Sequence, residues 1–269
     1  MPENFIARYG MAFNPFLKNS KEIIVPSAEY TEARSRLDYL LTVRGFGLLT
    51  GNPGQGKTTV VRNWLKSLNP SLYKPVYSCL STITVMDFYR NLAFSLGAEP
   101  AHRKSDNFKI IQDEITRYSE EKRITPVIVI DEVNHISNAI LNDLKLLFNF
   151  DMNSKDRAVV LLSGLNQICN SLSLSCNEPL RQRLIMNYKM SELSKDEARS
   201  YIIKKLEGAE CHQVVFEDAA LEAIVNSAGG IPRVINKICN ACLLIGNTLG
   251  VNTISAETVM RAVADCSLR

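Results

Sequence analysis

The sequence contains no apolar run that approaches the length of a membrane span. Such a span needs roughly 20 consecutive apolar residues, and polar or charged residues interrupt every apolar stretch of this 269-residue chain. The opening residues, Met1-Pro2-Glu3-Asn4-Phe5, also lack the basic-then-apolar order of a secretory signal peptide. We therefore expect a protein without a membrane partner.

Cysteine usage and net charge set further limits. Seven cysteines are an odd number in a large chain, so we expect no disulfide framework and a reducing, cytoplasmic compartment. Cys239 and Cys242 have metal-ligand spacing, but no second pair of Cys or His accompanies them, so packing inside a helix is the better interpretation. The net charge of +3 neither requires nor excludes a nucleic-acid partner.

The sequence does contain a complete phosphate-binding motif. Residues 51–58 match G-x-x-x-x-G-K-[ST], between an expected strand at 46–50 and an expected helix at 57–67. Glycines let backbone N–H groups face the phosphates, while the helix N-terminus adds partial positive charge. Lys57 should reach the β- and γ-phosphates, and the Thr58 hydroxyl should hold Mg²⁺. The predicted ATP-binding residues are Gly51, Asn52, Pro53, Gly54, Gln55, Gly56, Lys57, Thr58, Thr59, Asp131 and Arg233.

Two carboxylates follow a β-branched run about seventy residues later. Residues 126–130 read Pro-Val-Ile-Val-Ile, which is typical of a strand buried on both faces of a parallel sheet. Asp131 and Glu132 end this strand, at the sheet edge where the phosphates bind. Asp131 is suited to Mg²⁺, and Glu132 to polarising the attacking water as general base. At the end of the expected strand 158–163, Ser163 is the first candidate to touch the γ-phosphate or the water, and Asn166 the second.

The order of elements predicts an α/β fold with a helical second domain. Strands at 46–50, 74–80, 126–130 and 158–163 alternate with helices, which indicates a parallel sheet flanked by helices. The serine-rich stretch 170–177 is expected to be a loop. From residue 194 only helices are indicated, at 194–207, 217–227, 231–246 and 255–265. We predict a nucleotide-binding α/β domain over 1–192, opened by an irregular segment 1–26, and a small all-helical lid over 193–269.

Three arginines could complete the site. Arg181 and Arg183 stand just before the helical domain, and one of them could act on the nucleotide of a neighbouring subunit. Arg233 follows Gly229-Gly230-Ile231-Pro232 in the first turn of a helix. From there it could contact the γ-phosphate and couple the lid to the nucleotide state.

These motifs resemble those of the P-loop AAA+ ATPases, and more closely the ExeA-like branch with its transposition-helper relatives of the IstB, MuB and TnsC type. The likeness spans nearly the whole chain. It includes Asn14-Pro15-Phe16, the phosphate loop, Ile130-Asp131-Glu132, Leu180-Arg181-Gln182-Arg183 and Gly230-Ile231-Pro232-Arg233.

The resemblance implies ATP- and Mg²⁺-dependent hydrolysis and ATP-dependent homo-oligomers, rings or filaments, with ATP at subunit interfaces. It carries the trans finger onto Arg181 or Arg183 and a second sensor onto Arg233. It also places the segments 13–16 and 23–25 beside adenine. One departure concerns the first sensor: residues 164–168 read Gly-Leu-Asn-Gln-Ile where the branch has a Gly-Gln-Pro-Glu-Leu-like stretch.

Three functions remain open at this point. Our first hypothesis is a transposition helper that assembles on double-stranded DNA with ATP and engages a transposase, because the chain ends at Arg269 without the membrane span and cell-wall region of secretion-type relatives. The alternative is an ExeA-type secretion-assembly ATPase or another protein-remodelling ATPase. A third is a switch that binds ATP and turns it over slowly. Loop residues 103–104 and 155–157 are the candidates for DNA contact.

Overall fold

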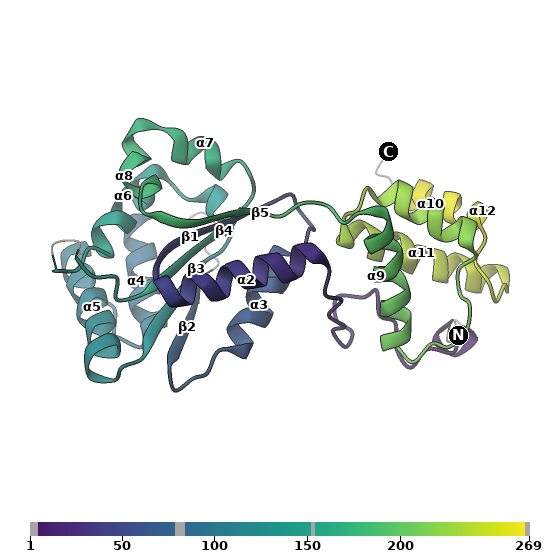
Figure 1. The fold of residues 1–269 in the computed structure, drawn as a ribbon, viewed down its shortest axis with the longest axis horizontal. Helices are drawn as coiled ribbons and strands as arrows, with labels where there is room; N and C mark the ends of the chain where they lie inside the picture. Colours follow the sequence, from purple (N-terminus) through teal and green to yellow (C-terminus); the bar gives the residue numbers. More distant parts are fainter. Residues whose placement is uncertain (1–4, 79–83, 152–153, 267–269) are drawn as a thin grey trace. The chain divides into compact units, whose positions relative to one another are not determined.

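The chain forms two compact units. The computed structural model describes residues 5–78, 84–151 and 154–266. Residues 32–53 and 57–190 form one unit, here called the α/β unit, and residues 1–31, 54–56 and 191–269 form the other, here called the helical unit (Figure 1). By packing, residues 5–31 group with the C-terminal helices, and the assignment of residues 1–26 to the nucleotide-binding domain stays a prediction. The functional boundary at 192/193 stays a prediction.

The α/β unit is built on a parallel sheet, as the sequence predicts. Its strands lie in the order β2-β3-β4-β1-β5, and each neighbouring pair is parallel. The three central strands β1, β3 and β4 are buried along their whole length, which explains why they read as unbroken apolar runs. The strands are β1 (Gly45–Thr50), β2 (Tyr73–Ser78), β3 (Thr125–Ile130), β4 (Val159–Gly164) and β5 (Leu184–Lys189).

Helices cover both faces of this sheet (Figure 1). On one face, Leu48, Ile130 and Leu162 join a hydrophobic core with residues of α4, α5 and α6. On the other face α2 approaches so closely that Leu40 leaves no room for a side chain at Gly47. The helices of this unit are α2 (Ala28–Val43), which starts just before it, α3 (Lys57–Ser67), α4 (Val85–Leu96), α5 (Lys104–Thr116), α6 (Asn138–Leu147), α7 (Ile168–Ser173) and α8 (Glu178–Arg181).

Two local predictions were wrong. The stretch expected as a loop holds α7 and a 3₁₀ turn, Ser175–Asn177. The fully buried Asn177 side chain stabilises it by donating to the carbonyl of Ser171 at 2.8 Å and to Asn138 Oδ1 at 2.9 Å. The second error is the missed fifth strand, β5. As an edge strand it pairs only with β1 and alternates in burial, so it lacks a continuous apolar run.

The helical unit has its own core. Ser194 and Glu197 form a capping box at the start of α9. Cys239 and Cys242 are buried in α11 and pack with the apolar residues of this core, as expected. The helices of this unit are α1 (Phe5–Arg8), α9 (Lys195–Gly208), α10 (Asp218–Ala228), α11 (Pro232–Leu249) and α12 (Ala256–Cys266). Among the described residues, no helix combines the length and the apolar character needed to span a membrane.

Candidate nucleotide site

The phosphate loop joins β1 to α3, as the motif predicts. Lys57, the first residue of α3, is buried, and its ammonium donates to the carbonyl oxygens of Gly51 at 2.9 Å and Asn52 at 3.0 Å. Gly56 has a φ of 103°, and a Cβ built there would meet no atom within 4 Å. A side chain at this position would therefore be strained and would project into the open space that the loop borders. The ammonium group of Lys57 lies inside the loop, where it can bind a phosphate group.

Asp131 is the centre of the polar contacts at this edge of the sheet. Its carboxylate is 3% exposed and accepts hydrogen bonds on both oxygens. Oδ1 accepts from the Ser163 hydroxyl at 2.8 Å and from the backbone N–H of Glu132 at 3.0 Å. Oδ2 accepts from the Thr58 hydroxyl at 3.3 Å and from the Tyr77 hydroxyl at 2.9 Å. The structure therefore brings the predicted Mg²⁺ residues Thr58 and Asp131 together.

The strand register explains why these residues meet. Ile130 lies beside Leu162 across the β3–β4 pair, so the next residues, Asp131 and Ser163, are neighbours on one face. On the other side of β3, Tyr77 lies beside Val129, two residues before Asp131 and on the same face. A phenol is long enough to span that offset. Tyr77 was missed by the sequence analysis, because nothing in a lone tyrosine predicts the strand register.

Glu132 follows with an unusual backbone. Its φ of 55° and ψ of 38° lie in the left-handed region, which costs a residue with a Cβ of order 1–3 kcal/mol. The hydrogen bond from its N–H to Asp131 supports this conformation. The side chain is half-buried at the sheet edge, directly after the carboxylate that faces Thr58. This position suits a group that activates water beside bound phosphates.

The two candidates for the first sensor have different surroundings. Ser163 is fully buried and its hydroxyl is used on Asp131, so it holds that carboxylate rather than facing a ligand. Asn166 lies beyond the strand, and its amide donates to the side-chain oxygen of Asn52 in the phosphate loop at 3.2 Å. Of the two, only Asn166 contacts the loop itself.

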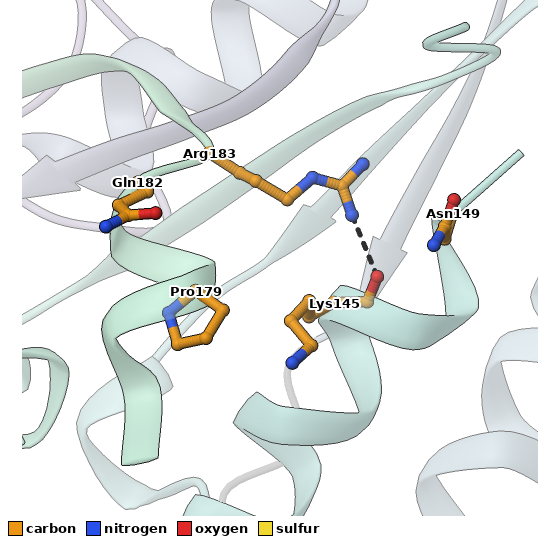
Figure 2. A pocket seen from close by; sticks show the side chains of 5 residues that line it. All are labelled: Lys145, Asn149, Pro179, Gln182 and Arg183. Atoms are coloured by element: carbon orange, nitrogen blue, oxygen red, sulfur yellow. Dashed lines mark hydrogen bonds between the residues drawn. The ribbon is translucent and has the colours of Figure 1, made fainter. Parts of the chain in front are cut away.

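The two arginines after α7 also differ. Arg183 donates to the carbonyl oxygen of Lys145 in α6 at 2.8 Å (Figure 2). It also donates to the carbonyl oxygen of Phe148, just after α6, at 2.9 Å. Its guanidinium lies 5.0 Å from the centre of the Phe46 ring and 3.6 Å from Asp156. Burial lowers the pKa of Arg183, and the Asp156 carboxylate partly offsets this. The guanidinium of Arg183 is therefore held by partners within its own subunit.

Arg181, two residues earlier, is exposed. Its side chain keeps 48% of its accessible surface, and its ion pair with Glu178 is long, at 3.7 Å. A hollow of about 430 Å³ lies beside α8, lined by Lys145, Asn149, Pro179, Gln182 and Arg183 (Figure 2). Of this pair, Arg181 is the more exposed, with 48% of its side-chain surface accessible against 17% for Arg183.

The remaining predicted residues lie in the helical unit. Arg233 is exposed in the first turn of α11, as its motif predicts. Asn14 is buried there: its side chain accepts from the N–H of Phe16 at 3.0 Å and donates to Asn240 at 2.7 Å. Phe16 is part of the core of this unit. The Asn-Pro-Phe motif thus anchors the N-terminal segment to α11, and its contact with adenine stays a prediction.

Three of the cations considered for DNA contact are paired within the α/β unit, among them Lys155, whose ammonium lies 3.5 Å from Asp151. Lys104 Nζ lies 2.6 Å from Asp143, and Arg157 lies 2.9 Å from Asp151 and 2.7 Å from Glu120. The Arg157 side chain is only 12% exposed. These contacts reduce the charge that either loop could offer to a phosphate backbone.

The donor set fits Mg²⁺ with a nucleotide. A hydroxyl and a carboxylate are hard oxygen donors, and Mg²⁺ is usually held by one or two carboxylates together with water and substrate phosphates. In the described part of the chain, no cluster of three or more His, Cys, Asp or Glu side chains could hold a metal. Thr58 and Asp131 would hold the ion, and Lys57 the phosphates.

Comparisons with known proteins agree with this geometry. Residues 41–172 match a family model described as AAA domain. General secretion pathway protein A of Aeromonas hydrophila is 30% identical over 264 residues, which cover 96% of this chain and 48% of the relative. The chain thus spans about half the length of this relative.

Solved structures share the fold at low sequence identity. Cdc6p from Pyrobaculum aerophilum superimposes with a TM-score of 0.72 at 16% identity, over 93% of this chain and 70% of that one. The Aeropyrum pernix ORC2 protein, in its ADPNP–ADP complexes, gives 0.70 at 16% identity, over 95% and 72%. The RuvB branch-migration motor of Thermotoga maritima gives 0.60 at 18% identity, over 95% and 74%. The chain therefore has the P-loop AAA+ fold, and its residues 41–172 are similar to AAA domains.

Proposed function

We propose that the chain binds ATP with Mg²⁺ and hydrolyses it, and that it works as the ATPase of a macromolecular assembly in the manner of ExeA-type secretion proteins. The observation that carries the first part is the contact between Thr58 and Asp131, 3.3 Å apart and next to Glu132. The relation to general secretion pathway protein A supports the second part. A reducing, cytoplasmic location belongs to the same proposal.

Each residue of the site has a proposed task. Lys57 binds the β- and γ-phosphates, and its ammonium then donates to the phosphate oxygens in place of the carbonyl oxygens of the loop. Bound Mg²⁺ supplies positive charge that stabilises the phosphates during transfer. Glu132 takes a proton from the attacking water as general base. Asn166, which already contacts the phosphate loop through Asn52, is the better placed first sensor, and Arg233 is the second.

The proposal also assigns Arg181 as the residue that acts on a neighbouring subunit's nucleotide. Its exposure supports this role, whereas the contacts of Arg183 engage that guanidinium internally. A trans arginine can contribute ~10³–10⁵ in rate. The rate of ATP hydrolysis per subunit should therefore rise with protein concentration as ATP-dependent homo-oligomers form.

The ATPase part is tested with three variants. Lys57→Ala should lose nucleotide binding, and unchanged ATP affinity would refute the main proposal. Glu132→Gln should bind ATP and hydrolyse it very slowly; a wild-type rate would remove Glu132 as the base. Lys57→Ala and Arg181→Ala should each be inactive, but their mixture should regain part of the rate, because one supplies the finger and the other an intact site. A mixture without activity would refute the trans role.

Our first sequence hypothesis, a transposition helper with a transposase partner, has less support. The relatives reported above include a secretion protein and no transposition protein. DNA remains a candidate because a solved protein of this fold, the Aeropyrum pernix ORC1 protein, is in complex with DNA (TM-score 0.68, 18% identity). Electron microscopy of Glu132→Gln with ATP, with and without duplex DNA, separates these functions. Rings or filaments that need DNA would favour a DNA-associated ATPase, and assembly indifferent to DNA would favour a protein partner.

A further inference from the structure

Tyr77 contacts the proposed metal site, although it is not among the residues proposed to bind the nucleotide or Mg²⁺. It lies on β2, an edge strand, and its side chain is 45% exposed. Its hydroxyl nevertheless donates to the buried carboxylate of Asp131 at 2.9 Å. A partly exposed ring whose hydroxyl reaches a buried carboxylate contributes little to the hydrophobic core, so this contact is the feature to explain.

The contact falls on one particular oxygen. Oδ1 of Asp131 is held by Ser163 and by the N–H of Glu132, whereas Oδ2 accepts from Thr58 and Tyr77. Oδ2 is therefore the oxygen on the side of Thr58, where the donor set fits Mg²⁺. An ionised carboxylate offers about four lone-pair sites, so Oδ2 can keep the bond from Tyr77 and still serve a second partner.

We propose that Tyr77 is a positioning residue for Mg²⁺, which holds Asp131 Oδ2 toward Thr58 so that the carboxylate is pre-oriented for the ion. This inference rests on the proposed ATP and Mg²⁺ binding. A fixed donor lets the carboxylate meet the ion or its water without reorientation, as second-shell groups do at other metal sites. The proposed role depends on the hydroxyl of Tyr77 and not on other contacts of its ring.

The test is Tyr77→Phe, which removes the hydroxyl and keeps the ring. Tyr73→Phe is the matched control, because Tyr73 lies on the same strand and the same face, four residues earlier. Affinity for a fluorescent ATP analogue is measured with Mg²⁺ and with EDTA, and Mn²⁺ binding in the presence of the nucleotide is followed by electron paramagnetic resonance. Thermal unfolding is measured for each variant without nucleotide.

Tyr77→Phe should reduce the Mg²⁺-dependent gain in nucleotide affinity by about tenfold and weaken Mn²⁺ binding by a similar factor, the effect of one hydrogen bond to a charged group. Its affinity in EDTA should match that of the wild type and of Tyr73→Phe, whereas its melting temperature without nucleotide should fall, because the variant loses one hydrogen bond to the buried carboxylate of Asp131. An unchanged or larger Mg²⁺-dependent gain would overturn the proposal. So would an equal loss of affinity in EDTA, since that indicates a structural role, and so would an unchanged melting temperature, since the hydrogen bond would then not hold the carboxylate in the absence of the ion. If the wild type itself bound no nucleotide in either condition, the proposed function would fail first.

Discussion

Replacing Arg181 or Arg183 by alanine separates two roles within one motif, the trans role proposed for Arg181 and the structural role of Arg183. Only one residue lies between these arginines, and sequence alone assigns the trans role to either. Arg183 donates two hydrogen bonds to the end of α6 and lies over Phe46, whereas Arg181 makes one long ion pair at the surface. We expect Arg183→Ala to destabilise the α/β unit and Arg181→Ala to leave its stability unchanged.

The magnitude follows from these contacts. A hydrogen bond from a charged donor contributes ~1.5–3 kcal/mol, and the low end applies here because the Arg183 side chain keeps 17% of its surface exposed. The two bonds together give about 3 kcal/mol, and the contact with Phe46 adds about 0.5–1 kcal/mol. Because these terms share one guanidinium they do not add fully, so we expect a loss of about 3 kcal/mol. An exposed ion pair such as that of Arg181 contributes ~0–0.5 kcal/mol.

The single tryptophan of the sequence makes this measurable. Trp64 is fully buried in α3, inside the α/β unit, so its fluorescence reports the unfolding of that unit. With a slope of ~2 kcal/mol per molar urea, a loss of 3 kcal/mol lowers the midpoint by about 1.5 M. Arg181→Ala should shift it by less than about 0.3 M. Equal shifts, or a larger shift for Arg181→Ala, would refute the assignment of Arg183 as the internally bound arginine.

Three further predictions concern packing, thiol reactivity and the pH dependence of stability. Gly164→Ala should destabilise the same unit by ~1–3 kcal/mol in the urea assay, because the added Cβ would lie 2.9 Å from Asn134 Oδ1 and from Val133 Cγ2; wild-type stability would show that this loop yields freely. Ellman's reagent should modify the exposed Cys169 in the folded protein and Cys242 only after unfolding, since burial raises the pKa of Cys242 to about 12. Its ordinary pKa is 9.0, so the stability contributed by the protonated thiol is present below pH 9 and is lost as pH rises from 9 toward 12. Circular dichroism during urea unfolding at pH 8 and pH 10 should show lower stability at pH 10; an increase would contradict the sign.

The elements that sequence predicts well are those that bury both faces. β1, β3 and β4 read as apolar runs because helices cover each side of the sheet. The phosphate loop is equally readable, because its glycines and lysine serve backbone geometry and charge that few other residues can supply. Thr58 and Asp131 were expected to share Mg²⁺, and the structure brings them within 3.3 Å.

The remaining features depend on the register between strands and on the edge strands of the sheet, and both leave weaker patterns in the sequence. β5 has one partner strand and alternating burial, so its pattern is short and mixed. Whether Ser163 faces a ligand or a neighbouring carboxylate depends on the pairing of Ile130 with Leu162, a property of two strands that lie thirty residues apart. The same holds for Arg183, whose partners are carbonyl oxygens at the end of α6 and therefore carry no side-chain signature.

Asp131 shows why composition alone could not describe this site. Its four donors come from α3, β2, β4 and its own following peptide, and each would serve a carboxylate equally well in isolation. What distinguishes them is the oxygen that each one holds. Two donors fix Oδ1 inside the sheet, and two face the side of the phosphate loop, so the carboxylate has one anchored oxygen and one that can respond to the ion. In the proposed Mg²⁺ complex, Asp131 Oδ2 would turn from the Thr58 hydroxyl to the ion, while Tyr77 and Ser163 hold the carboxylate in place.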